Sequence, residues 1–324
     1  MIAHLLLAAI AAAPLPLSAT TSRNGVYFVN DYPPGESGPP HALSALIGEE
    51  AWTAIMPLEH RPAAMTSAGN QLWFADMHDG AADMYLLRLG GTTAPRSRMV
   101  ATIAVGNGGI DLTTLDGNLV VATFEEGLHL QVLKGGQWSD FPTPPVFGTA
   151  HLNTLAGAPI VAEEVVGGVR LWHWNDDAWT AGGQYAVEGH LRDLVIRDAW
   201  PVLLMEQDNT TRLIALQQDG GVDLTAWPTP PGRWAVLPTQ RGFLLLGVER
   251  RGRVTATPIG WPSGDLGEAR ELDEATNEPR SLLSVIWTAL MIAAGLAMIL
   301  SLRRGSQRGK KGTKTDSGPP PTRR

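Results

Sequence analysis

The sequence predicts an all-β domain of six repeated units, followed by one membrane-spanning α-helix near its end. Three observations predict this fold class. Short apolar strands recur at a nearly fixed interval, one stretch of 22 residues near the end carries no charge, and no helical apolar stripe longer than a couple of turns occurs before residue 281.

The first residues form an apolar run that is too short to span a bilayer and is typical of a secretory signal peptide. We expect residues 1–19 to be that signal. Cleavage suits two small-residue sites, after Ala13 in Ala-Ala-Ala and after Ala19 in Leu-Ser-Ala, and the second is preferred because Thr20 then opens a polar mature chain. No Lys or Arg precedes the run, so an uncleaved anchor or a buried helix is the alternative.

A repeated unit follows, in which a turn signal leads into a short apolar strand. Counted from the first residue of each strand, the spacings are 46, 47, 41, 42 and 41 residues. The six strands are Val26 to Val29, Leu72 to Ala75, Leu119 to Ala122, Ile160 to Ala162, Val202 to Met205 and Phe243 to Leu246.

Each repeated strand is flanked by further strand signals. A turn precedes each repeated strand, and it contains residue types that tolerate positive φ, as in Asp116-Gly117. A second strand follows, often alternating apolar with polar residues, and most units then close with an aromatic residue and a proline, as in Trp138 with Pro142.

A period of 40 to 47 residues with about four short strands per unit predicts a six-bladed β-propeller over residues 22–262. A long β-sandwich is the competing fold, although it would not require a fixed period. Units of strand, turn and strand that end in Trp and Pro resemble the kelch, BNR and quinoprotein-like propeller groups. That resemblance implies only the architecture, because no catalytic residue of those groups has a matching position here.

Acidic turns after the repeated strands are the candidate binding site. If the units align, four of these turns share one rim and form a ring able to hold Ca²⁺, a cationic ligand or a basic segment of a partner. Solvated turns, or charges that keep exposed strand edges from aggregating, explain the same residues. The candidate residues are Asp76, His78, Asp79, Glu125, Glu126, Glu163, Glu164, Glu206 and Asp208.

The C-terminal part predicts an acidic linker over 263–280, a transmembrane helix from Ser281 to Leu302 and a basic disordered cytoplasmic tail over 303–324. At about 1.5 Å per residue the span reaches about 33 Å, which matches the hydrocarbon thickness. Basic residues follow the span and acidic residues precede it, so the C-terminus is expected in the cytoplasm. A stripe of small residues is a candidate homodimer contact, made by Ala289, Ala293 and Ala297.

Composition narrows the functional class. The chain has no cysteine, which excludes disulfides, Cys-ligated metal and covalently attached c-type haem. The tail carries a net charge of +7, which leaves −14 for the rest of the chain and argues against a nucleic-acid partner. A large exported domain without disulfides is typical of the bacterial envelope, so we expect a single-pass protein of the bacterial inner membrane with its N-terminal domain in the periplasm or outside the cell.

No catalytic sequence motif is found, and His41, His60, His151 and His190 lack metal-binding spacing. The favoured function is therefore a membrane-anchored binding or scaffolding module that takes a protein or glycan ligand. The alternative is an exported hydrolase or lyase that acts on glycans or lactones, with acidic residues converging at the central channel. Three or more carboxylate and His side chains converging at the channel mouth would favour the enzyme, whereas an apolar channel would favour binding.

Overall fold

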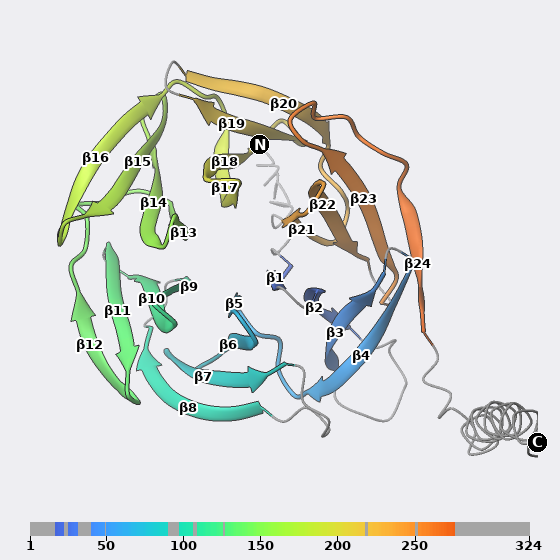
Figure 1. Ribbon diagram of the computed structural model, residues 1–324, viewed down its shortest axis with the longest axis horizontal. Coiled ribbons are helices and arrows are strands. Elements are labelled where there is room, and N and C mark those ends of the chain that lie inside the picture. Colours follow the sequence, from blue (N-terminus) through green and yellow to red (C-terminus); the bar gives the residue numbers. More distant parts are fainter. Residues whose placement is uncertain are drawn as a thin grey trace, which may run out of the picture. The chain divides into compact units, whose positions relative to one another are not determined.

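The computed structural model describes residues 17–22, 25–31, 40–48, 50–89, 97–105, 109–125, 127–217, 220–249 and 252–275. These residues form a ring of β-sheets around a central axis, and their strand pairs are antiparallel except for one (Figure 1). The predicted span from Ser281 to Leu302, the tail and the small-residue stripe lie outside the described residues. Within the described part of the chain, no helix is long and apolar enough to cross a bilayer.

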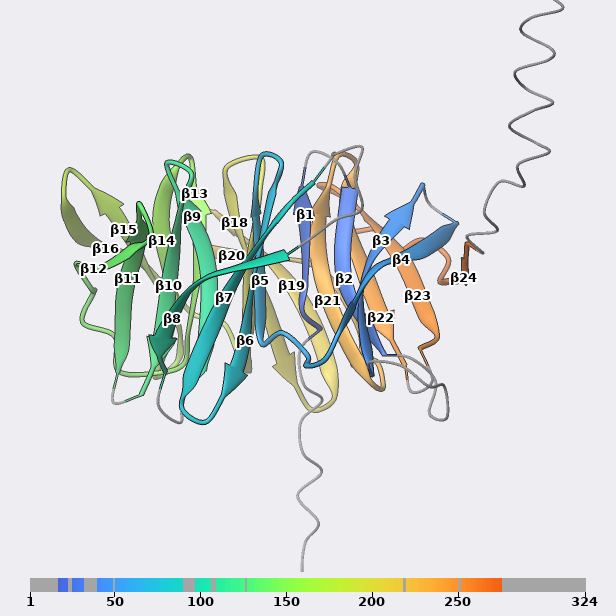
Figure 2. The ribbon, with the colours of Figure 1, turned by 90° about the horizontal axis from the view of Figure 1, so that it is seen from below.

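The described strands form six successive groups of four, each ordered from the axis outward (Figure 1). Seen from the side, the inner strands run roughly along the axis of the ring, and outer strands such as β8 and β4 are inclined to it (Figure 2). The innermost strands are β1 (Ala19–Ser22), β5 (Ala64–Ala68), β9 (Ile110–Leu115), β13 (Ala150–Leu155), β17 (His190–Arg197) and β21 (Arg233–Thr239). The second strands are β2 (Gly25–Asp31), β6 (Gln71–His78), β10 (Asn118–Phe124), β14 (Ala158–Val165), β18 (Trp200–Gln207) and β22 (Gly242–Val248).

The third and fourth strands complete each group toward the outside. The third strands are β3 (His41–Ile47), β7 (Ala81–Arg88), β11 (Leu128–Lys134), β15 (Gly168–Asn175), β19 (Thr210–Gln217) and β23 (Val254–Gly260). The outermost are β4 (Ala51–Leu58), β8 (Ser97–Ala104), β12 (Gln137–Phe141), β16 (Ala178–Tyr185), β20 (Gly220–Pro228) and β24 (Arg270–Glu274). Four groups are separate sheets, and the first and last join into one sheet of eight strands. The prediction of an all-β, propeller-like fold is confirmed.

The six strands that repeat in the sequence are the second strands of the groups, not the first. In β10, for example, Leu119, Val120, Val121 and Ala122 are all fully buried. A second strand is covered on both faces by neighbouring groups, so its sequence is a continuous apolar run. An innermost strand borders the axis and carries polar residues, which makes its pattern weaker in the sequence.

The hydrophobic core lies between adjacent groups. Val120 and Ala122 of β10 pack in one cluster with Leu152 of β13 and Val161 of β14, which belong to the next group. The turns between first and second strands have the expected conformation, since Asp116 and Gly117 both have positive φ, at 51° and 78°. Packing between groups therefore fixes the ring, and local turn chemistry fixes the hairpins.

The ring closes at its outer edge through a strand that the sequence assigned to the linker. β24 pairs in parallel with β4, with Asp273 opposite Ala51 and Glu274 opposite Trp52. Leu272 is buried in the core between the first and last groups. The fold therefore extends past residue 262 to Ala275, and it begins before residue 22 with β1. Only one residue in five of β24 is buried, which is why it reads as an acidic linker in the sequence.

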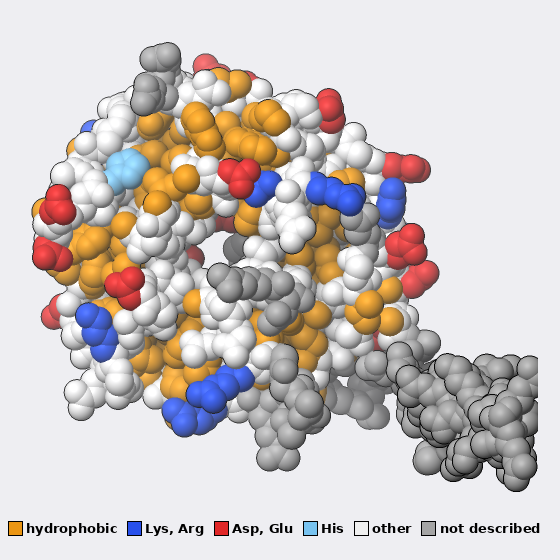
Figure 3. Space-filling view, in the orientation of Figure 1, with side chains coloured by type: hydrophobic (Ala, Val, Ile, Leu, Met, Phe, Trp, Pro, Cys, Tyr) orange, Lys and Arg blue, Asp and Glu red, His pale blue; other side chains and the backbone are white. Residues whose placement is uncertain are grey.

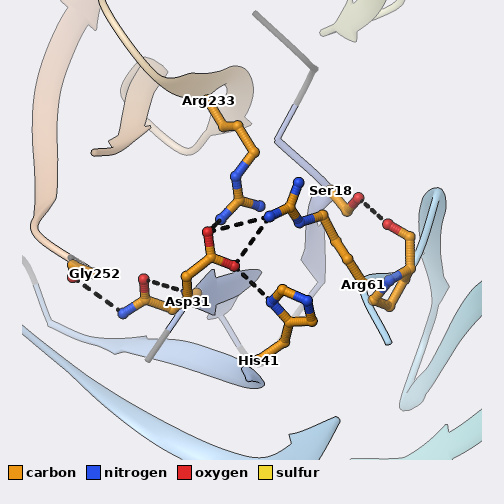
Figure 4. Close-up of polar contacts among 8 residues, drawn as sticks. Ser18, Asp31, His41, Arg61, Arg233 and Gly252 are labelled. Atoms are coloured by element: carbon orange, nitrogen blue, oxygen red, sulfur yellow. Dashed lines mark hydrogen bonds and ion pairs between the residues drawn. The ribbon is translucent and has the colours of Figure 1, made fainter. Parts of the chain in front are cut away.

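At the inner edge an ion-pair network closes the ring (Figure 4). Asp31, at the end of β2, accepts hydrogen bonds from Arg233 at 2.6 Å and from Arg61 at 3.2 and 3.3 Å, and pairs with His41 at 2.6 Å. Burial acts to raise the pKa of Asp31, but these positive partners lower it overall. One carboxylate thus ties the first group to the second and to the last.

Candidate functional site

The predicted acidic residues lie at the rim where second strands end and innermost strands begin. Glu206 stands opposite His190 in the antiparallel register of β17 and β18, and Glu163 stands opposite Ala150 in that of β13 and β14. Asp76 occupies the corresponding end of β6. This common rim explains the repeated position of the acidic turns.

At this rim three of the predicted carboxylates each have a cationic or imidazole partner of their own. Asp76 lies 3.0 Å from Nδ1 of His60, and Glu164 lies 3.1 Å from Nδ1 of His190. Glu206 accepts a hydrogen bond from Nε of Arg192. The carboxylates are therefore distributed around the rim in separate pairs.

Glu163 is a buried structural carboxylate. Its side chain accepts hydrogen bonds from the Trp172 indole at 2.9 Å and from the backbone amide of Phe147 at 3.1 Å. Arg170 lies 3.8 Å away. These contacts hold the loop before β13, on which Phe147 stands 90% exposed.

The remaining candidates lie in turns. Asp79 and Asp208 adopt positive φ, at 40° and 49°, in the hairpins after β6 and β18. His78 lies 3.9 Å from Asp83, and Glu125 follows the end of β10. Glu126 lies outside the described residues. No group of three His, Asp or Glu side chains close enough to share a metal ion is found in the described part of the chain, so the predicted Ca²⁺ ring gains no support there.

The innermost strands surround a cavity of about 690 Å³. Figure 3 shows the hollow at the centre of the ring. Part of its lining carries hydroxyl or amide groups: Thr20, Thr66, Ser67, Thr113, Thr114, Asn153 and Thr154. The channel lining therefore combines polar groups with apolar ones such as Ile110, Val236 and Leu237, in contrast to the apolar core between the sheets.

Three titratable side chains meet in this cavity from three neighbouring strands. Nδ1 of His151 on β13 lies 3.9 Å from Oδ2 of Asp111 on β9 and 4.0 Å from Oδ1 of Asp193 on β17. Both Asp111 oxygens accept backbone amides, from Leu112 at 2.8 Å and Leu152 at 2.9 Å. Asp193 accepts the amide of Leu194 through Oδ1 at 2.7 Å. Asp111 is thus fixed as a bridge between groups, and Asp193 is the more available carboxylate.

The environment shifts the pKa of each of these three side chains in the direction that favours the neutral form. Burial raises the pKa of Asp193 to about 7, assisted by the charge of Asp111 and opposed by the Leu194 amide. Burial raises the pKa of Asp111 to about 6 against its two backbone hydrogen bonds, and burial lowers the pKa of His151 to about 4. Asp193 keeps 44% of its side chain exposed to the channel, so water there moderates its shift.

A smaller cavity of about 230 Å³ adjoins these residues. It is lined by His151, Arg192, Asp193 and Glu206 together with apolar groups that include Leu17 and Trp234. The Arg192 and Glu206 pair therefore connects the predicted acidic rim to the channel cluster.

The sequence interpretation missed Asp111 and Asp193 and treated His151 as scattered. All three stand directly before a buried leucine at the start of an innermost strand, namely Leu112, Leu152 and Leu194. Their spacings of 40 and 42 residues match the repeat. A search for polar residues at that register would have found them.

No family model matches the chain, and no curated protein matches it. Comparison with solved structures places it among β-propeller proteins. The fucose-specific lectin from Aleuria aurantia superposes with a TM-score of 0.58 at 12% identity, covering 81% of this chain and 97% of the lectin. A chain of a nidogen–laminin complex gives 0.53 at 11%, covering 79% and 95%, and the tricorn protease gives 0.56 at 14%, covering 79% and 26%. At these identities the likeness concerns the fold alone.

Proposed function

We propose that the chain is a membrane-anchored, exported binding module, whose six four-stranded groups act as six blades, and that its ligand site is the mouth of the central channel. One observation carries this proposal: innermost strands from several groups line one cavity of about 690 Å³, with the polar cluster of Asp111, His151 and Asp193 in its lining. A concave site with convergent polar groups suits a small ligand.

The chemistry of the lining favours a small hydroxyl-rich ligand. Threonine hydroxyls such as those of Thr20 and Thr66 can donate and accept hydrogen bonds, and a carboxyl that titrates near neutrality can do the same. Sugars present the same groups in return. The Asn153 amide and the Thr154 hydroxyl already bond within the ring, to Leu194 and Thr114. The fold likeness to a fucose-specific lectin makes fucosides a sensible first choice among candidate ligands, and the nidogen–laminin likeness keeps a protein ligand as the second choice.

Calorimetry tests the site directly. The purified chain is titrated with methyl glycosides of fucose, galactose, mannose and N-acetylglucosamine. We expect one class to bind, and Asp193→Asn to weaken that binding at least tenfold. Asp177→Asn is the matched control, because it makes the same change in the turn between β15 and the outermost strand β16. Equal binding by both variants, or no binding of any glycoside, would reject the sugar site.

A second candidate function is hydrolysis, because the convergence of Asp111, His151 and Asp193 is the pattern expected of the enzyme and the pKa of Asp193 agrees with it. Binding is proposed first because either function requires a ligand to bind at this site. A carboxyl with a pKa of about 7, held 4.0 Å from an imidazole, is suited to general acid or base catalysis. Aryl glycosides and lactones are the substrates to assay. Turnover that Asp193→Asn abolishes while ligand binding persists would support the enzyme, and binding without turnover would support the module.

Membrane anchoring is a proposal from the sequence. It rests on the uncharged stretch from Ser281 to Leu302 and on the charge asymmetry around it. The test is extraction at alkaline pH combined with protease accessibility of a C-terminal tag. We expect the chain to stay with the membrane and the tag to be protected in intact cells; release into the soluble fraction would contradict the anchor.

A further inference from the structure

The described fold begins at Leu17, inside the segment that the sequence assigned to a signal peptide of residues 1–19. β1 (Ala19–Ser22) is the innermost strand of the first group and pairs with β2 from Ala19 opposite Phe28 to Ser22 opposite Gly25. Ser67 of β5 donates its hydroxyl to the carbonyl of Thr21. β1 is therefore an integral part of the ring.

Leu17 and Ser18, the two residues before β1, are also hydrogen-bonded to the ring. The Leu17 amide donates to the Trp234 carbonyl at 3.1 Å, and the Ser18 carbonyl accepts the Val29 amide at 3.0 Å. The Ser18 hydroxyl donates to the carbonyl of Pro62, a contact drawn in Figure 4. These contacts reach the first, second and last groups of the ring.

The Leu17 side chain is 5% exposed and belongs to the core cluster that joins the first and last groups. In that cluster it packs with Phe28, Leu237 and Leu246, among others. It also lines both channel cavities. A cut after Ala19 would remove this side chain from the core and place a charged ammonium on Thr20 within β1.

We infer that leader processing removes the chain before Leu17, within the alanine run Ala11 to Ala13, and not after Ala19. The alanine run supplies the small residues that a signal peptidase requires, at the end of the apolar segment. Water hydrolyses the peptide bond, leaving a carboxylate on the leader and an ammonium on the mature chain. The mature protein then keeps Leu17, Ser18 and all of β1.

The experiment is N-terminal sequencing and intact mass measurement of the full chain, expressed with a C-terminal tag in a Gram-negative host. We expect the mature chain to begin between Ala12 and Pro14. A mature chain that begins at Thr20 overturns the inference while leaving export intact. A chain that keeps Met1 overturns both the inference and the proposed cleaved leader on which it rests.

Two variants separate the alternative sites. Replacing Ala11, Ala12 and Ala13 together by leucine is expected to cause at least a fivefold accumulation of uncleaved precursor. Ala19→Val is the control: it blocks a cut after residue 19, is compatible with a strand, and is expected to leave processing unchanged. The opposite pattern, with precursor accumulating only in Ala19→Val, overturns the inference.

Discussion

Arg233 donates from Nη2 to Oδ2 of Asp31 across 2.6 Å and so joins residues 202 positions apart in the chain. Arg233 opens the innermost strand of the last group, and Asp31 ends the second strand of the first. The contact that closes the ring at its inner edge is thus a partly buried ion pair, supported by Arg61 and His41.

We expect Arg233→Ala to lower the free energy of unfolding by about 2 to 3 kcal/mol, because it leaves a partly buried carboxylate with weaker partners. Urea unfolding measures the loss. Arg98→Ala on the exposed face of β8 is the control and should change stability by less than about 0.5 kcal/mol. Equal effects of the two variants would show that the pair does not close the ring.

The ion-pair network around Asp31 also predicts that the stability of the fold decreases in acid. The pKa of Asp31 is lower in the fold than its ordinary value of 3.8, so its contribution is complete above that value and is lost as pH falls through the lowered one. Asp31→Asn should therefore lose most of its stability deficit relative to the parent chain in strong acid. Thermal melting of both chains between pH 2 and 7 tests this, and a deficit that stays constant across the range would contradict it.

The Asp193 carboxyl in the channel predicts the opposite dependence of stability on pH. The pKa of Asp193 is raised from 3.8 to about 7, so its contribution is most favourable below 3.8 and is lost as pH rises through about 7. Asp193→Asn should raise stability by about 1 kcal/mol at pH 8 after allowance for channel water, and by much less at pH 4. Asp177→Asn should show no such trend. A gain that does not grow with pH would argue against the raised pKa.

The hydrogen bonds of Glu163 predict that two substitutions at this position lower the free energy of unfolding by different amounts. Glu163→Ala leaves the Trp172 indole and the Phe147 amide without their acceptor and should cost about 2 to 4 kcal/mol. Glu163→Gln keeps one acceptor oxygen and should cost about half as much. Urea unfolding followed by tryptophan fluorescence measures both, and equal costs would show that the loop before β13 does not depend on this acceptor.

The outer closure can be tested with two leucines. Leu272 of β24 is 4% exposed, whereas Leu266 just before it is 42% exposed. Leu272→Ala should cost about 2 to 4 kcal/mol and Leu266→Ala less than about 1 kcal/mol. If both substitutions were nearly neutral, residues 263–275 would behave as the linker that the sequence predicted.

Only part of the candidate site could be predicted from the sequence. The rim position of Asp76, Glu164 and Glu206 follows from their repeated place after apolar strands, and the structure does bring them to one rim. Their partners His60, His190 and Arg192 could not be assigned, because pairing depends on which strand ends face each other across hairpins and between groups. The spacing of Asp111, His151 and Asp193 was visible in the sequence, but their convergence depends on closure of the ring.

The sequence by itself determined the repeat, the all-β class and the second strand of each group, because a strand covered on both faces must be apolar throughout. It also determined the hairpin turns, where Asp and Gly adopt the positive φ of a tight turn. Only the tertiary structure showed that the fold extends beyond the predicted bounds of residues 22 and 262. Leu17 and Leu272 belong to the fold because they fill the core between the first and last groups, and local pattern holds no information about a surface that exists only once the ring has closed.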